Sequence, residues 1–392
     1  MSDSAIKPAG VSDRVWDLYR GSIVIDMHND MPTKVLDDDY DPGQRHTCAE
    51  GHTDVPRLVE SGLTAQWFAA WVGATYATME PDGSFARALV SIDVVHALVR
   101  RHPDTLLAAT TAADVRRAKQ VGKIAIGIGV EGGHAIEGSL DKLHTLYTRG
   151  ARYLTLTWNN GNPWAGSSIG VGGTRTGGLT EFGRGVIREM NRLGMLVDVS
   201  HVSDATFADV LDTSSVPVIA SHSSARALSD HPRNLRDHQL RALAARGGVV
   251  CINFYPRFID DRYRHDVEVA DAELAAATPA KSPVANEPGV ERAHAARVAR
   301  LAAIAPVPLR VLVDHIDHVA HVAGIDHVGL GSDFDGISAV PAQMEDVTAF
   351  ARIAQALVDR GYDDTSVSKI LGGNVLRLLG DVLTADPAPS SR

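Results

Sequence analysis

The chain of 392 residues is 44% hydrophobic and 22% charged, an ordinary globular composition with room for one large domain or two smaller ones. Its formal net charge of -10, with acidic residues dispersed along the chain, argues against a nucleic-acid backbone or an anionic lipid surface as partner, so we expect a small-molecule substrate. The two cysteines, Cys48 and Cys251, indicate neither a disulfide framework nor a cysteine-based zinc site. Residues 1–10 lack the features of a secretory signal, and no apolar run has membrane-spanning length, so we predict a soluble, cytoplasmic protein.

Short apolar runs of strand type alternate with segments of helical periodicity along the chain. We expect strands within residues 23–30, 63–72, 123–130, 153–157, 195–199, 216–220, 248–254 and 327–332. Helical spacing predicts helices within residues 11–19, 85–101, 140–149, 181–193, 347–360 and 367–382. Long loops are expected at 36–54 and 161–178, and an Ala-, Pro- and charge-rich segment at 260–308 contains a predicted flexible piece at 278–288. The sequence assigns no role to the Ala- and Pro-rich residues 272–308.

Eight strands alternating with helices, most with polar residues at the carboxyl end, predict an α/β fold of the (β/α)8 TIM-barrel type. The active site should then lie at the carboxyl ends of the strands. The structural alternative is a doubly wound open sheet, which concentrates function at one switch point. We expect residues 12–383 to form a single barrel domain, preceded by a polar leader at 1–11 and followed by a flexible tail at 384–392.

His28 and Asp30 stand at the end of the first strand run. In a strand, residues two apart share a face, and Pro32 stops regular pairing just beyond them. An isolated pair of this kind more often caps a strand and begins a turn. Other strand ends carry similar groups, because Glu131 follows the third expected strand and precedes two glycines that allow a sharp turn.

Two successive strands each end in Ser-His, and the last strand ends in an aspartate. The residues expected to converge are His28, Asp30, Glu131, His201, His222 and Asp333. Imidazoles and carboxylates without thiolates suit zinc or another borderline divalent ion, and this number of ligands suits two ions. Glu131 is then a candidate bridge between two ions that share a hydroxide, and Asp333 a candidate base. The alternative for Glu131 is an ion pair with a nearby arginine.

Several other polar residues have weaker assignments. His46 and His52, in the loop at 36–54, are more often simply solvated in such a position. His134 either orients Glu131 or has no metal role, and Asp335 is expected to cap a turn. Three histidines before the last strand are expected on one solvated or packed helix face, away from the catalytic end: His315, His318 and His321.

The polar strand ends lie in longer motifs at 25–32, 129–134, 198–201, 221–224 and 331–336. Together, and in this order from about residue 12 to residue 380, they resemble the signatures of the membrane (renal) dipeptidase family of the amidohydrolase superfamily. The resemblance implies a barrel with two Zn²⁺ per chain that hydrolyses dipeptides through a hydroxide bridging the ions. A D-residue is often accepted at the C-terminal position, and a homodimer is implied.

The resemblance also implies roles for matching residues. The metal ligands would be His28 and Asp30 for one zinc ion, His201 and His222 for the other, and Glu131 as the bridge. Arg233 matches the arginine that binds the terminal carboxylate of the substrate, for which a bidentate guanidinium is suited. Tyr255 matches a residue that lines the pocket, and Asp333 matches the catalytic acid and base.

Trp158 departs from the family pattern, because the family often has a histidine there that contacts the scissile carbonyl. An indole N–H donates a hydrogen bond but carries no positive charge. Loss of one oxyanion donor lowers the rate by about 10²- to 10³-fold. Asn159 or Asn160 is the candidate substitute, and Trp158 and Asn159 are therefore counted among the substrate-binding residues.

Three functions remain open at this point. The first is a zinc-dependent dipeptidase. The second is a specialised amide hydrolase that acts on a modified peptide and uses Trp158 as a wall of its pocket. The third is a metal-binding family member without hydrolytic activity, for which Trp158 is the sole support, whereas the intact ligand set and Asp333 argue against it.

Overall fold

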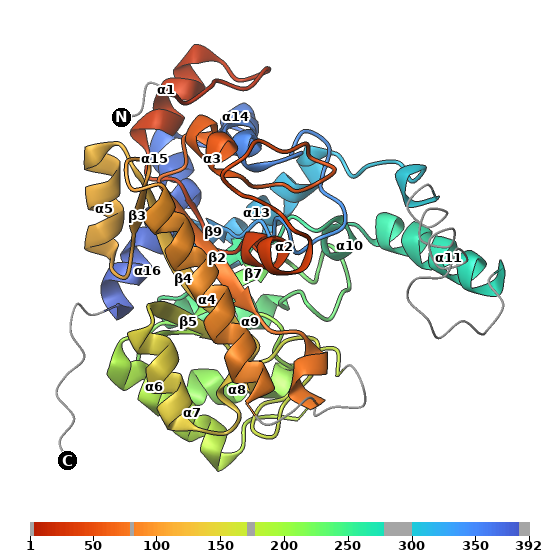
Figure 1. The fold of residues 1–392 in the computed structure, drawn as a ribbon. Helices are drawn as coiled ribbons and strands as arrows, with labels where there is room; N and C mark the ends of the chain where they lie inside the picture. Colours follow the sequence, from red (N-terminus) through yellow and green to blue (C-terminus); the bar gives the residue numbers. More distant parts are fainter. Residues whose placement is uncertain (1–3, 79–81, 171–176, 278–299, 384–392) are drawn as a thin grey trace.

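The computed structural model describes residues 4–78, 82–170, 177–277 and 300–383 (Figure 1). The flexible piece expected at 278–288 and the tail at 384–392 lie outside these residues. The described strands are β1 (Ile25–Asp26), β2 (Ala65–Trp71), β3 (Leu106–Ala108), β4 (Ile124–Glu131), β5 (Ala151–Thr155), β6 (Leu196–Asp198), β7 (Ile219–Ser223), β8 (Val249–Ile252) and β9 (Val328–Leu330). All pairings between them are parallel.

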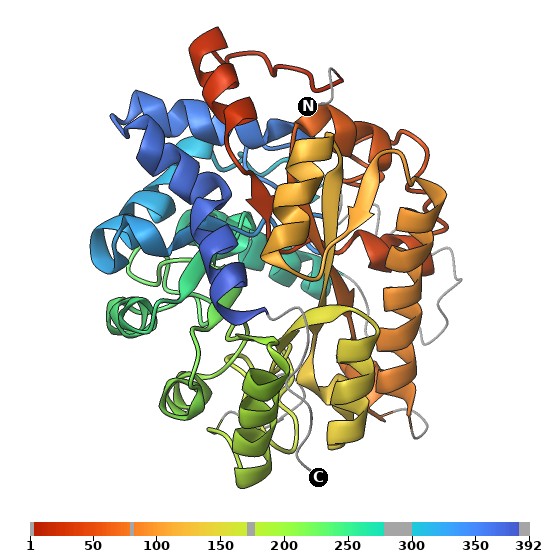
Figure 2. The ribbon, with the colours of Figure 1, turned by 90° about the vertical axis from the view of Figure 1, so that its left-hand side faces the viewer.

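Eight of these strands close into a ring. Its order is β1-β2-β4-β5-β6-β7-β8-β9, and the pairing of β9 with β1 completes it. β3 pairs with the first residues of β4 and is additional to the ring. The helices lie around the outside of the strands (Figures 1 and 2). The predicted (β/α)8 TIM barrel is thereby confirmed, and each of its eight strands overlaps a run that the sequence indicated. β5 begins two residues before its expected run, and β7 extends three residues beyond its own.

Fifteen α-helices are described. They are α1 (Asp13–Gly21), α2 (Met31–Asp37), α3 (Val55–Ser61), α4 (Gly83–Arg101), α5 (Ala112–Val121), α6 (Leu140–Thr148), α7 (Glu181–Leu193), α8 (Asp204–Thr213), α9 (Asp237–Ala245), α10 (Pro256–Ile259), α11 (Asp261–Ala277), α13 (Leu309–Ala323), α14 (Phe350–Asp359), α15 (Asp364–Ser368) and α16 (Asn374–Val382). Short helical turns of other types are η1 (Ala74–Thr78), η2 (Gly133–Ile136), η4 (Ile325–His327), η5 (Val347–Ala349) and η6 (Lys369–Gly373). Every described helix is too short or too polar to cross a bilayer.

The barrel has two apolar layers, because neighbouring residues of a strand point to opposite faces. Ile25 and Trp67 belong to the cluster inside the ring, whereas their neighbours Val24 and Phe68 pack against the outer helices. Residues of α5 and α16 join the inner cluster. These two helices therefore close the amino-terminal end of the barrel and leave the carboxyl end for the site.

Two glycines of β4 make room for large rings inside the barrel. A Cβ atom at Gly127 would lie 2.1 Å from the ring of Trp67, and one at Gly129 would lie 1.8 Å from the ring of Tyr153. Real Cβ atoms do not approach this closely, so any side chain at Gly129 would displace Tyr153. This matters for the site, because the hydroxyl of Tyr153 contacts His28.

Some elements differ from the sequence-based expectation. The sequence did not indicate β3, α5, α8 or α9, whose apolar residues are few or interrupted by charges. Helix α2 begins directly after the strand expected at 23–30, and its last residues overlap the loop expected at 36–54. The single helix expected at 367–382 is divided by η6, where a Cβ at Gly372 would lie 2.6 Å from the carbonyl oxygen of Ile23. The charged segment after 260 begins with α11, which points away from the barrel in Figure 1.

Candidate metal centre

Five strands bring polar side chains together at the carboxyl end of the barrel. β4 ends in Glu131 and β7 contains His222, whereas the other residues lie two to four positions after the end of a strand. The residues that converge are His28 and Asp30 after β1, Glu131, His201 after β6, His222, and Asp333 after β9. All are buried, with exposed fractions from 0% for His28 to 9% for Asp333. The six residues expected to converge therefore do so.

Glu131 stands between the histidines. Its Oε2 lies 3.4 Å from Nε2 of His28, whereas its Oε1 lies 2.8 Å from Nε2 of His201 and 3.4 Å from Nε2 of His222. Asp30 also lies beside His28, with its Oδ2 at 3.4 Å from Nε2 of that histidine. Each oxygen of Glu131 thus faces a different side of the centre.

The other ring nitrogen of each histidine has a partner that fixes the ring. Nδ1 of His28 lies 2.9 Å from the hydroxyl of Tyr153, and Nδ1 of His201 donates to Oδ1 of Asn159 at 3.2 Å. Nδ1 of His222 donates to the hydroxyl of Ser221 at 2.8 Å, because that hydroxyl itself donates to Asp198 at 2.6 Å. These contacts leave an Nε2 lone pair on His201 and on His222, the form in which imidazole binds a metal.

Two buried aspartates support the loops that carry the ligands. Asp26 accepts hydrogen bonds from the backbone of His28 and from both the N–H and the hydroxyl of Ser332, at 3.3, 2.8 and 2.6 Å. Asp198 accepts from the N–H and hydroxyl of Ser221 in the same way, at 2.9 and 2.6 Å. Each aspartate therefore ties its own strand to a neighbouring strand that carries a site residue.

The backbone is strained at two site residues. His201 and Asp333 have positive φ angles of 69° and 63°, a region that non-glycine residues rarely adopt. The neighbouring contacts hold Asp333 in place: its N–H donates to the carbonyl of His28 at 3.0 Å, and its Oδ2 accepts from Asn253 at 2.8 Å. Such strain is typical of residues that the surrounding fold positions for function.

Burial and neighbouring charges shift the ionisation of the centre. Burial raises the pKa of Asp333 to about 8, with Asp30 and Glu131 adding to the rise. Burial also opposes ionisation of Glu131, but the surrounding imidazoles, chiefly His28, hold the pKa of Glu131 well below its usual range. Burial lowers the pKa of His201 to about 4. His201 and His222, whose pKa values burial lowers, are therefore neutral donors beside an ionised Glu131. The pKa of His28 is instead raised well above its usual value, because the nearby Tyr153, Glu131 and Asp30 outweigh the opposing effect of burial.

The donor set fits a divalent metal. Nε2 of His201 and Nε2 of His222 lie 3.0 Å apart, and two lone pairs at that distance repel each other unless a cation or a proton lies between them. Nε2 of His28 and Oδ1 of Asp30 are buried without a hydrogen-bond partner. Two sets of donor atoms, each within 4.8 Å of one another, can hold an ion: His28, Glu131 and His222, and His28, Asp30 and Asp333. The donors are nitrogen and oxygen, as zinc and similar ions prefer.

A cavity of about 250 Å³ opens onto this centre. The sequence-based candidates Trp158, Asn159 and Tyr255 line it, as do Trp71 and Phe258, which the sequence did not single out. Asn159 also holds His201, a role that only the contact across strands reveals. The cavity is thus acidic and imidazole-rich at its floor and aromatic at its walls.

Arg233 lies beside the centre but not among the residues that line the cavity. It is 2% exposed, donates to the carbonyl of His222 at 3.2 Å and packs over the ring of Phe258 at 5.4 Å. Within the described residues it makes no ion pair with a carboxylate, and its Nε has no partner. Burial lowers the pKa of Arg233 to about 10. A buried guanidinium that forms no ion pair with the protein is suited to bind an anionic ligand.

The remaining candidates lie outside the centre. Nε2 of His46 contacts the carbonyl of Asp41, and His52 exchanges hydrogen bonds with Asp335, which joins two loops. His134 lies 3.5 Å from the side-chain nitrogen of Asn160 and not within hydrogen-bond distance of Glu131. The sequence did not indicate Tyr153, Asp26 or Asn253 as part of the site. Only the Asp-x-His spacing of Asp26 and His28 offered a signal.

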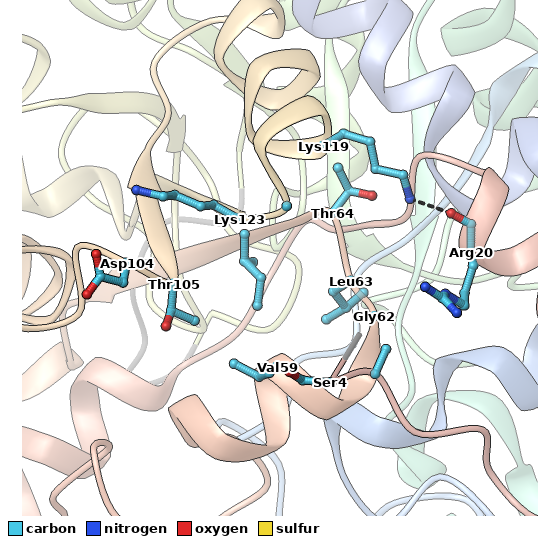
Figure 3. A pocket seen from close by; sticks show the side chains of 13 residues that line it. Ser4, Arg20, Val59, Gly62, Leu63, Thr64, Asp104, Thr105, Lys119 and Lys123 are labelled. Carbon is cyan, nitrogen blue, oxygen red and sulfur yellow. Dashed lines mark hydrogen bonds between the residues drawn. The ribbon is translucent and has the colours of Figure 1, made fainter. Parts of the chain in front are cut away.

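A second cavity, of about 270 Å³, lies at the amino-terminal end of the barrel (Figure 3). Arg20, Lys119 and Lys123 line it, and no histidine is among its lining residues in the described chain. The ammonium of Lys119 donates to the carbonyls of Arg20 and Ser22 at 2.8 and 2.7 Å, which caps the end of α1. Asp104 supplies the one carboxylate among its described lining residues, which is too few for a metal centre, and the barrel core separates this cavity from the centre.

A closed (β/α)8 barrel with buried imidazole and carboxylate donors at its carboxyl end defines the class of barrel metallohydrolases. The chain belongs to the membrane dipeptidase family, peptidase family M19, whose family model matches residues 12–391. It is therefore a metallopeptidase of a dipeptidase family, as the sequence motifs predicted.

Solved structures of similar proteins agree with this assignment. Dipeptidase AC, a metallopeptidase of family M19, is 27% identical, with a TM-score of 0.74 over 93% of this chain and 99% of that chain. A metallopeptidase from Rhodobacter sphaeroides, liganded with a phosphinate mimic of the dipeptide L-Ala-D-Ala, is 26% identical, with a TM-score of 0.74 over 92% of this chain and 99% of that chain. The probable dipeptidase PvdM from Pseudomonas aeruginosa shares the fold at 24% identity, with a TM-score of 0.79 over 96% of this chain and 99% of that chain.

Proposed function

We propose that the protein hydrolyses dipeptides, including dipeptides with a D-residue at the C-terminal position, with two zinc ions in its centre. The observation that carries this proposal is the convergence of three imidazole Nε2 atoms with the carboxylates of Asp30 and Glu131, and with Asp333 beside them. The D-residue is supported by the Rhodobacter sphaeroides relative, which is liganded with a mimic of L-Ala-D-Ala.

His28 and Asp30 would hold one ion, His201 and His222 the other, and Glu131 would bridge them. The support is that Oε2 of Glu131 faces His28, whereas Oε1 faces His201 and His222. When bound, two such ions lower the pKa of the attacking water and polarise the scissile carbonyl.

Asp333 acts as the acid and base. Its Oδ2 is held by Asn253, which leaves Oδ1 for proton transfer. Asp333 takes a proton as the water oxygen attacks the carbonyl carbon, and returns it to the nitrogen of the leaving amine as the C–N bond breaks. Arg233 binds the C-terminal carboxylate, for which its buried and unpaired guanidinium is suited.

Trp158 gives the second candidate, a specialised amide hydrolase that acts on a modified peptide. It stands in the cavity where the family often has a histidine, and it cannot supply that positive charge. Asn159 is a candidate substitute for that histidine, but its side-chain oxygen already accepts a hydrogen bond from His201. The two candidates differ in the substrates that they predict.

Metal content and hydrolysis of L,L and L,D dipeptides, measured on one zinc-loaded sample, test the proposal. We expect two zinc ions per chain, efficient cleavage by the wild type, and a loss of kcat of at least about a hundredfold in Asp333→Asn with the zinc retained. Zinc without cleavage of any dipeptide would contradict the proposal. Broad cleavage that appears only in Trp158→His would favour the specialised hydrolase, and none in either protein would favour the non-hydrolytic alternative.

A further inference from the structure

Trp71 and Trp158 form an aromatic wall on one side of the cavity. Trp71 is the last residue of β2 and Trp158 follows β5. Their rings meet edge to face, with centroids 5.1 Å apart and planes at 73°. Both side chains are partly exposed and line the cavity, so their apolar surface is available to a ligand.

The wall lies across the barrel from the carboxylate-binding arginine. In the closed strand order, β4 and β8 stand opposite each other, with β2 and β5 on either side of β4. Trp71 and Trp158 therefore lean together over the end of β4. Arg233 packs on Phe258 of α10, which follows β8.

This arrangement orients a dipeptide. With its carboxylate at Arg233 and its scissile bond at the centre, the chain runs toward the end of β4, and its N-terminal residue meets the wall. An indole pair with exposed apolar surface favours a large apolar or aromatic side chain there, because such a side chain buries more area than that of alanine.

We propose that Trp71 and Trp158 select dipeptides whose N-terminal residue carries an aromatic or other large apolar side chain. This inference rests on the proposed dipeptide hydrolysis. Burial of a phenylalanine side chain against the wall corresponds to a preference for Phe-Ala over Ala-Ala of about 10- to 100-fold in kcat/KM. Trp158, which departs from the family pattern, is then a specificity residue.

The test compares Phe-Ala with Ala-Ala in the zinc-loaded wild type, Trp71→Ala, Trp71→Phe and the exposed control Val90→Ala on α4. We expect the ratio of kcat/KM for Phe-Ala to kcat/KM for Ala-Ala to fall at least tenfold in Trp71→Ala. The same ratio should stay close to the wild-type value in Trp71→Phe and in the control. Equal ratios in the wild type and Trp71→Ala would overturn the inference.

A binding measurement separates this inference from the proposed function. In the Asp333→Asn protein, calorimetric titration should give at least tenfold tighter binding of Phe-Ala than of Ala-Ala, and this difference should be lost when Trp71→Ala is added. Equal affinities would overturn the inference while leaving dipeptide hydrolysis intact. Failure of the wild type to cleave either dipeptide, with the binding preference present, would instead count against the proposed reaction.

Discussion

Gly336 lies directly against the carboxylates of the centre. A Cβ atom there would stand 2.2 Å from Oδ2 of Asp30 and 2.6 Å from Oδ1 of Asp333. The backbone at Gly336 is exposed, so the requirement for glycine comes from these two oxygens and not from the packing of the core. The carboxylates of Asp30 and Asp333 can keep their positions because residue 336 has no side chain.

We therefore predict that Gly336→Ala lowers kcat/KM for dipeptides at least tenfold and changes the melting temperature by only a few degrees, because the added methyl displaces Asp30 and Asp333 but no core residue. The matched control is Gly185→Ala in α7, where a Cβ would meet nothing within 4 Å. Activity assays and circular dichroism melts measure both effects. Full activity in Gly336→Ala would contradict the predicted displacement.

At the scale of elements, α13 holds two loops of the catalytic end through one buried histidine. Nδ1 of His315 accepts from the N–H of Ala225, just after β7, and its Nε2 donates to the carbonyl of Ile259 at the end of α10. The sequence predicted that this histidine and its neighbours lie on a packed or solvated helix face, away from the catalytic end. The position is wrong for His315, because its ring contacts loops that follow the carboxyl ends of β7 and β8. His315 is the packed member, whereas His318 is partly exposed and contacts Asp237.

Burial lowers the pKa of His315 from 6.5 to about 4, so the folded state holds it neutral. Because the folded pKa is below the unfolded pKa, its stabilising effect is complete above pH 6.5 and is lost as the pH falls toward 4. We expect a loss of about 2 kcal/mol in the free energy of unfolding at pH 5 relative to pH 7 from this group.

Urea denaturation at pH 7 and pH 5 measures this loss. His315→Gln, which does not titrate, should narrow the difference between the two pH values by about the same amount, even though it lowers stability at pH 7. An equal pH dependence in both proteins would show that His315 does not titrate in this range.

At the scale of the whole molecule, the centre joins distant parts of the chain. Its residues lie at the ends of β4 and β7 or after β1, β6 and β9, so one bound ion links strands around the ring. Without a cation, the carboxylates of Asp30, Glu131 and Asp333 and the lone pairs of the imidazoles face one another in a buried space. Metal binding should therefore stabilise the barrel as well as serve the reaction.

Removal of metal by a chelator should lower the melting temperature by about 5 °C, the shift that corresponds to a ligand at about 1,000 times its Kd in a chain of this size. Readdition of zinc should restore the original melting curve in the wild type but not in His28→Ala. Calorimetric scans with and without chelator measure the shift. Identical scans for metal-loaded and chelator-treated protein would contradict it.

The eight barrel strands and the polar residues at their carboxyl ends could be predicted from the sequence, because strand periodicity and the position of a strand end are local properties of the chain. From these, the convergence of His28, Glu131 and Asp333 followed from the rule that parallel strands of a barrel present their ends together. The family assignment also rested on local motifs.

The contacts between side chains of different strands could not be predicted from the sequence and are seen in the folded structure. Tyr153 reaches His28 because Gly129 leaves room for its ring, and Trp71 meets Trp158 because β4 brings β2 and β5 together. Such contacts depend on the register between strands and on closure of the ring, which arise from the packing of residues far apart in the sequence. Local sequence patterns do not encode that packing. The contact of Tyr153 with His28 and the pairing of Trp71 with Trp158 are therefore visible only in the folded structure.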